Sequence, residues 1–176
     1  MSDPIAYHEQ AARQEERIYE TSAAATRRQR VRDLLGPEPG DSVLSVGCGP
    51  GFEPAEIAPV VGADGHVLGL DRSDAMLGLA ADRCREYERV SLAAGDAAAL
   101  PVATDTVDAA TAVQVYEYVP DVDAALAELA RVLAPGGRAV LCDADWDAVV
   151  WRSPDSERMA RVLDAFDDHC PHPRLG

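Results

Sequence analysis

The stretch that decides the fold is VLSVGCGPGFEP, residues 43–54, in which an apolar run leads into Gly47, Gly49 and Gly51. Glycine adds backbone freedom that costs entropy on folding, so glycines clustered after an apolar run indicate a tight turn or a close approach to a bound molecule. The apolar run is typical of a buried strand, and the residues that follow the glycines are typical of a helix. The stretch therefore predicts a strand, a glycine loop that contacts a ligand, and a helix.

The composition is that of one folded domain. The chain has 176 residues, of which 47% are hydrophobic, which is enough for a genuine core. No apolar run reaches the length needed to cross a bilayer, and residues 1–20 are charged and polar where a signal peptide would be apolar. We therefore expect a cytoplasmic protein without a membrane partner.

Charge and cysteine content exclude two classes of function. The formal net charge of −15 would repel the phosphates of a nucleic acid, and the basic stretch TRRQRVR, residues 26–32, is typical of a solvated helix face. The four cysteines form no CxxC pair, and HCPH, residues 169–172, has no second group of ligands elsewhere. We therefore expect neither a nucleic-acid partner nor a metal.

Strand-like and helix-like segments alternate along the chain, which predicts parallel strands with helices on both faces. The expected fold is a Rossmann-like three-layer α/β/α sandwich with a mainly parallel sheet and additional N-terminal helices. We expect an N-terminal helical cap, 1–40, and a ligand-binding domain, 41–176. The expected strands are 42–46, 66–70, 89–94, 108–115 and 137–145, and the expected helices lie within 5–35 and at 52–61, 73–87, 121–133 and 156–170.

Polar residues follow the strands that neighbour the glycine loop. Asp71 ends the second expected strand, where a carboxylate can accept hydrogen bonds from both hydroxyls of a ribose. Asp96 follows the third strand, where it can accept from an exocyclic amino group such as that of adenine. A dinucleotide fold would carry GxGxxG, but Phe52 stands at the position of the third glycine.

Four motifs in this order, GCGPG, HVLGLD, AAGDA and AVQVYEYV, resemble those of the class I S-adenosylmethionine-dependent methyltransferases. The resemblance covers about residues 30–145 and is strongest to the small-molecule branch, which includes the ubiquinone and menaquinone biosynthesis C-methyltransferases. It implies that S-adenosylmethionine is the cofactor, that S-adenosylhomocysteine is the product, and that a small molecule accepts the methyl group.

The same resemblance assigns cofactor contacts to residues of this chain. Asp71 would hold the ribose, Met76 would pack on the adenine, and Asp96 with the amide of Ala97 would read the adenine edge. The residues implied at the methionine end of the cofactor are Gly47, Gly49, Gly51, Gln114 and Val115.

Two departures from the family pattern stand out. The family usually has an acidic residue where this chain has Ser45, so the network near the amino group of the cofactor lacks that charge. The sixth and seventh strands of the family's sheet are also missing, so the sheet is expected to be incomplete at its C-terminal side. We expect the sequence to be a fragment of a longer protein, whose uncovered edge would favour self-association. The alternative is a natural short form in which another chain covers that edge.

No fixed catalytic residue follows from the sequence, because the donor is already activated by its positive charge and catalysis can come from positioning alone. Where the acceptor must lose a proton, the candidate bases are Asp143, Asp145 and Tyr116. Tyr7 and Tyr19 could cover the cofactor, as aromatic residues do in similar enzymes. The alternatives are a catalytically inactive protein that binds the same cofactor and an NAD-dependent oxidoreductase.

Overall fold

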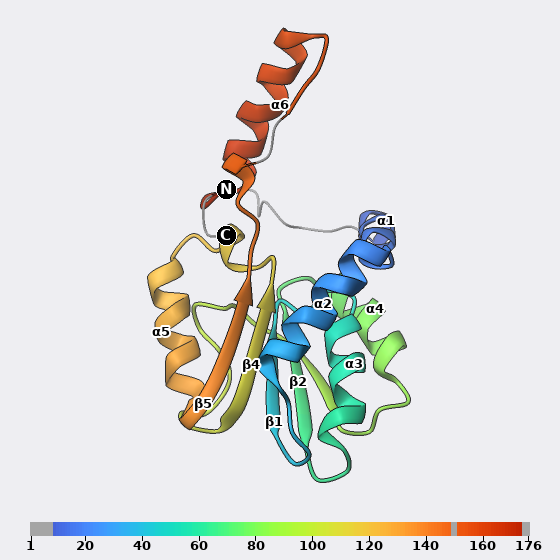
Figure 1. Ribbon diagram of the computed structural model, residues 1–176, viewed down its shortest axis with the longest axis vertical. Coiled ribbons are helices and arrows are strands. Elements are labelled where there is room, and N and C mark those ends of the chain that lie inside the picture. The colour runs from blue at the N-terminus through green and yellow to red at the C-terminus, as the bar shows by residue number, and fades with distance from the viewer. Residues whose placement is uncertain (1–8, 149–150, 174–176) are drawn as a thin grey trace.

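The computed structural model describes residues 9–148 and 151–173, and its centre is a parallel sheet of five strands in the order β3-β2-β1-β4-β5 (Figure 1). All four strand pairs are parallel. The strands are β1 (Ser42–Val46), β2 (His66–Asp71), β3 (Val90–Ala94), β4 (Val107–Val113) and β5 (Leu133–Cys142). The helices are α1 (Glu9–Tyr19), α2 (Ser22–Leu35), α3 (Phe52–Val61), α4 (Asp74–Cys84), α5 (Val122–Val132) and α6 (Ser156–His169), with short 3-10 helices η1 (Tyr116–Tyr118) and η2 (Trp146–Ala148).

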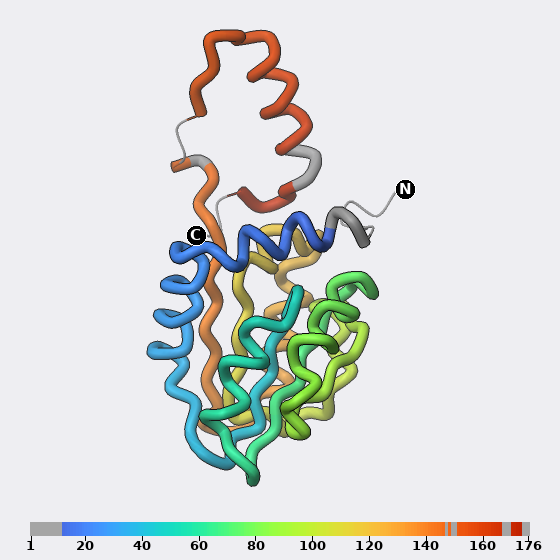
Figure 2. The backbone as a smooth tube through the Cα atoms, turned by 90° about the vertical axis from the view of Figure 1, so that its right-hand side faces the viewer, coloured from blue at the N-terminus to red at the C-terminus, as the bar shows by residue number. Residues whose placement is uncertain are grey.

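Helices cover both faces of the sheet, which confirms the predicted three-layer sandwich. Helix α5 lies on one face, whereas α2, α3 and α4 lie on the other (Figures 1 and 2). Side chains of β1 alternate between the two cores: Leu44 and Val46 join the core on the α5 face, and Val43 joins the core with Leu35 and Ile57. This alternation is what the period of two along a strand dictates.

The boundaries of β4 and β5 differ most from the sequence prediction. Strand β4 ends at Val113, because Gln114 adopts a φ of 56° and turns the chain into η1. Strand β5 begins at Leu133, which pairs with Val107, while the next pair joins Ala109 to Arg138. The segment APGG, expected as a turn, is therefore an irregular part of the strand rather than a connection before it.

The two ends of the chain are arranged differently. Helix α2 contacts β4 and β5 and so belongs to a layer of the sandwich, while the division of the chain at residue 40 stays a prediction. Helix α6 stands away from the sheet, and Trp146, Trp151 and Phe166 pack together at its side (Figures 1 and 2). Within the described residues no strand follows β5. None of the helices in this part of the chain is long and apolar enough to span a membrane.

Candidate functional site

A pocket opens at the carboxyl ends of β1, β2 and β4, where an open parallel sheet places its ligands. Its wall contains eight of the nine residues that the sequence assigned to the cofactor, and Gly51 is the ninth. The eight are Gly47, Gly49, Asp71, Met76, Asp96, Ala97, Gln114 and Val115.

The glycine loop between β1 and α3 is fixed by backbone hydrogen bonds. Cys48 N donates to Leu70 O at 2.8 Å, and Gly51 N donates to Cys48 O at 3.0 Å. Gly49 lines the pocket with a φ of 52°, and the nearest atom that an added Cβ would meet is Tyr19 Oη at 4.0 Å. The space beside Gly49 is therefore open to a ligand.

Gly51 has a different structural role from Gly49. It precedes α3 with a φ of 80°, and an added Cβ would lie 2.7 Å from Ala80 Cα on α4. No side chain fits there unless the helix moves. Gly51 thus allows the loop to pack against α4, and it does not line the pocket.

Asp71 links the glycine loop to the beginning of α4. Its Oδ2 accepts from Gly49 N at 2.8 Å, and its Oδ1 accepts from Ser73 N at 2.9 Å. Burial raises the pKa of Asp71, and the bonds from the Ser73 and Gly49 amides oppose that rise. Since an ionised carboxylate has about four acceptor sites, Asp71 can hold the loop and still accept from two ligand hydroxyls.

The adenine side expected from the sequence combines an apolar and a polar wall. Met76 and Ala97 are buried, and Ser73 Oγ accepts from Met76 N at 3.3 Å, which caps α4. Asp96 is exposed, and its Oδ1 accepts from Ala98 N at 2.9 Å. A flat apolar ring with amino groups at its edge suits such a wall.

None of the three candidate bases lines the pocket. Asp143 accepts from Val115 N at 2.8 Å and so fixes the wall from outside, and burial raises its pKa. Tyr116 is buried in the α5 core, where desolvation raises its pKa to about 12. Asp145 is exposed and accepts from Ala148 N at 3.3 Å. The contacts of Asp143 and Asp145 and the burial of Tyr116 give all three residues structural roles.

The pocket wall also contains residues to which the sequence analysis assigned no cofactor contact. Tyr118, Val119 and Pro120 follow Gln114 and Val115 along the same segment, and Glu15 reaches the wall from α1. Tyr118 and Val119 lie within the fourth motif and Pro120 follows it directly, which was the available signal for these three residues. The further lining residues absent from the sequence assignment are Val46, Leu70, Arg72, Ser73, Gly95 and Leu100.

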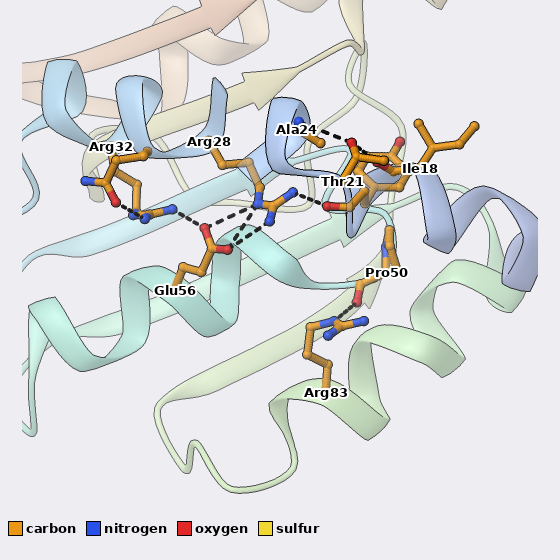
Figure 3. Close-up of polar contacts among 10 residues, drawn as sticks. Ile18, Thr21, Ala24, Arg28, Arg32, Pro50, Glu56 and Arg83 are labelled. Atoms are coloured by element: carbon orange, nitrogen blue, oxygen red, sulfur yellow. Dashed lines mark hydrogen bonds and ion pairs between the residues drawn. The ribbon is translucent and has the colours of Figure 1, made fainter. Parts of the chain in front are cut away.

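Helix α1 is held over the loop by contacts with α3 and α4. Tyr19, which lines the pocket, stacks on Phe52 with ring centroids 6.3 Å apart, and Arg83 lies 3.5 Å from the centroid of the Phe52 ring. Arg83 also bonds Glu16 at 2.5 Å. It donates to Pro50 O at 2.9 Å as well, and this contact is drawn in Figure 3. Tyr7, the other expected cover, lies outside the described residues.

The C-terminal segment returns to the far side of η1. The Cys170 thiol donates to Glu117 O at 3.6 Å, and His172 N donates to the same oxygen at 3.1 Å. Glu117 is fully buried, and its Oε2 accepts from Trp146 Nε1 at 2.8 Å. Within residues 9–148 and 151–173, no three metal-binding side chains lie together.

A parallel sheet with a glycine loop after β1 and a carboxylate after β2 defines a class of proteins that bind a nucleoside-containing cofactor. A family model described as a methyltransferase domain matches residues 43–137, more than half of the chain, and the chain belongs to that family. This finding confirms the prediction of a class I S-adenosylmethionine-dependent methyltransferase, and nothing found favours the two alternatives.

Individual relatives agree with this assignment. A 2-phytyl-1,4-naphtoquinone methyltransferase of Synechococcus elongatus is 43% identical over 109 residues, which are 60% of this chain and 47% of the relative. An uncharacterized 37.1 kDa protein in transposon TN4556 of Streptomyces fradiae is 36% identical over 155 residues, 88% of this chain and 43% of the relative. This chain thus spans less than half the length of both.

One solved structure shows that the fold is shared over nearly the whole chain. A SAM-dependent methyltransferase from Aquifex aeolicus superposes with a TM-score of 0.68 at 19% identity, over 90% of this chain and 87% of that one. The likeness extends past the 43–137 match and confirms the predicted Rossmann-like fold.

Proposed function

We propose that this chain binds S-adenosylmethionine in the pocket at the carboxyl ends of β1, β2 and β4 and transfers its methyl group to a small molecule. The observation that carries the proposal is Asp71, which faces the pocket while its carboxylate is held by Gly49 N and Ser73 N. The ribose would bond to Asp71, and the methionine part would lie along Gly49.

A quinone-like ring is the proposed acceptor class. The relatives include the 2-phytyl-1,4-naphtoquinone methyltransferase described above and a demethylmenaquinone methyltransferase of Staphylococcus aureus, which is 37% identical over 113 residues. Val119, Pro120 and Tyr118 give the pocket an apolar and aromatic wall next to Val115, which suits a flat apolar ring. Because none of the three candidate bases lines the wall, the reaction would depend on holding a carbon of the reduced, electron-rich quinol ring in line with the methyl group. The new carbon–carbon bond would form as the sulfonium–methyl bond breaks, and the ring carbon would then lose its proton to solvent.

Binding and transfer are tested separately. Calorimetric titration with S-adenosylhomocysteine and with NAD should give binding of the first and not of the second. Incubation with labelled S-adenosylmethionine and the reduced quinol of a demethylated naphthoquinone should then yield a labelled quinol. Binding of NAD alone would overturn the proposal, and cofactor binding without label transfer would exclude this acceptor class.

The remaining expectations about partners belong to the same proposal. We expect a cytoplasmic protein with no nucleic-acid partner, and two arginines of the basic stretch 26–32, Arg28 and Arg32, are already paired with Glu56. Arg28 is buried, so the helix face is less solvated than its pattern indicated. Self-association through the outer edge of β5 is expected as well, and sedimentation of the purified chain at several concentrations tests it.

A further inference from the structure

Three buried polar side chains meet where α3 faces β1 and β4. Glu53 lies in the first turn of α3, and Ser45 and Thr111 are paired neighbours on β1 and β4. Thr111 Oγ1 donates to Glu53 Oε1 at 3.4 Å. The side chains of all three are nearly inaccessible, at 6% for Glu53, 0% for Ser45 and 1% for Thr111, and Ser45 Oγ has no hydrogen-bond partner among the described residues.

Glu53 is a buried carboxylate without a counter-ion in the described part of the chain. The nearest arginines of α2, Arg28 and Arg32, are both directed at Glu56, as Figure 3 shows. Arg28 also donates to Tyr19 O at 2.8 Å, so its guanidinium is held at the corner between α1 and α2. A buried charge without a partner is costly, and a cation bound nearby would offset part of that cost.

The glycine loop is where such a cation would bind. Glu53 follows the loop directly, and Gly49 of that loop lines the pocket. The methyl donor carries a sulfonium, an ammonium and a carboxylate group and is a net cation. The demethylated product lacks the sulfonium charge and is neutral overall. Across a low-dielectric interior, a carboxylate distinguishes two such ligands without touching either.

We propose that Glu53 is a positioning residue whose negative charge makes the pocket favour the cationic methyl donor over the neutral product. This inference rests on the proposed function, since it presumes that the pocket binds S-adenosylmethionine. The preference would help to release the product after each transfer. It would act through the glycine loop, because Glu53 does not line the pocket.

The charge state of Glu53 gives the preference a pH dependence. Burial, with the nearby Glu56, raises its pKa to about 7, and Thr111 and the two arginines oppose that rise. Desolvation also raises the pKa of the neighbouring thiols, which therefore stay neutral at pH 7. The charged and titratable groups that act on Glu53 or are acted on by it are Glu56, Arg28, Arg32, Cys48 and Cys142.

The test is calorimetric titration of the whole chain with S-adenosylmethionine and with S-adenosylhomocysteine at pH 6 and pH 8. The ratio of the two affinities cancels every contact that both ligands share, including those of Asp71. We expect the ratio to favour the donor about fivefold more at pH 8 than at pH 6, because a single group with a pKa of about 7 limits the change over this range to less than about tenfold. Binding of the donor should also release protons near pH 7, because a bound cation lowers the pKa of the carboxyl.

Variants separate the charge of Glu53 from its packing. Glu53→Gln keeps the shape and should remove the difference between the two ratios, whereas Glu86→Gln, the same change at an exposed position, should leave it as in the parent chain. A pH-dependent ratio that survives Glu53→Gln overturns the inference, as does a ratio in the parent chain that does not change with pH. If neither ligand binds the parent chain, the proposed function itself fails.

Discussion

The glycine loop is flanked by two carboxylates, the half-buried Asp71 and the buried Glu53, whose hydrogen-bond partners differ. Asp71 lines the pocket and accepts two backbone N–H groups at 2.8 and 2.9 Å. Glu53 lies outside the wall and accepts one long bond, at 3.4 Å from Thr111. Burial raises the pKa of both. The two hydrogen bonds of Asp71 fix the geometry of the glycine loop and of the start of α4. Glu53 has only one long bond, and we propose that a cationic ligand offsets its charge.

The largest expected effect on cofactor affinity is that of removing the Asp71 side chain. Asp71→Ala deletes the acceptor of the Gly49 amide as well as two expected charge-assisted bonds to the ribose, together about 4 kcal/mol of binding free energy. Affinity for S-adenosylhomocysteine, measured by calorimetry, should therefore fall several hundredfold, since each step of about 1.4 kcal/mol is tenfold. Asp71→Asn keeps the size and should lose less. Equal affinity of the parent chain and Asp71→Ala would refute the assignment of the ribose.

A matched pair of glycine substitutions should separate the open side of the loop from its packed side. Asparagine tolerates a positive φ, so the backbone conformation itself is affordable at both positions. Gly51→Asn should lower the free energy of unfolding by about 3 kcal/mol, because its Cβ would overlap Ala80. Gly49→Asn should stay folded and lose cofactor binding, because its side chain would enter the pocket.

Circular dichroism melts and calorimetry on the two glycine variants measure the two effects. The assignment of a ligand-facing role to Gly49 fails if Gly49→Asn binds S-adenosylhomocysteine as tightly as the parent chain does. The packing role of Gly51 fails if Gly51→Asn melts at the same temperature as the parent chain.

Glu53 should oppose folding at alkaline pH, because burial raises its pKa in the folded chain. Its pKa is about 7 in the folded chain against an ordinary value of 4.5, so the folded state keeps a proton that the unfolded chain loses between these values. Stability is therefore lost as the pH rises from 4.5 to 7. Glu53→Gln should be more stable than the parent chain by about 2 kcal/mol at pH 8 and about equally stable at pH 4.5.

Chemical denaturation at both pH values gives this comparison, with Glu86→Gln as the control for the charge change. A stabilisation by Glu53→Gln of the same size at pH 4.5 and pH 8 would mean that the effect does not come from the buried charge. A loss of stability at pH 8 would mean that the carboxylate is paired after all.

Local signals made it predictable that the residues we propose for the cofactor would line one pocket. The glycines, Asp71 and Asp96 stand at strand ends, and since parallel strands end at the same edge of the sheet, their spacing along the chain was sufficient to bring them together. The three candidate bases were chosen on the same argument. Position after a strand says nothing of where a side chain points, and Asp143 turned out to bond the Val115 amide from behind the wall.

The Glu53 cluster and the contacts of Glu117 were beyond the reach of such signals. Glu53 meets Thr111 across 58 positions of the chain, and Glu117 meets Trp146 across 29. Neither pair forms a motif, because each depends on how α3 and the segment after β5 pack on the sheet. A glutamate is normally exposed, so its burial appears only once the chain is folded.

Trp146→Phe should have the smallest effect on cofactor affinity. It tests the hydrogen bonds of Glu117, a carboxylate outside the pocket wall. Glu117 is another buried carboxylate, and it lies outside the pocket wall, as Glu53 does. Like Asp71, it accepts two hydrogen bonds, from Trp146 Nε1 at 2.8 Å and from Ala144 N at 3.1 Å. Phenylalanine removes the indole donor, and the loss of that bond should cost about 1 kcal/mol of stability. Affinity for S-adenosylhomocysteine should change less than about twofold, because geometry at Gly49 and Asp71 is untouched.

Trp151→Phe, at an exposed ring of the same aromatic group, is the matched control and should melt close to the parent chain. A tenfold loss of affinity in Trp146→Phe would show that the segment after β5 shapes the cofactor site. Glu117, which lies outside the pocket wall, would then affect cofactor affinity as Asp71 does.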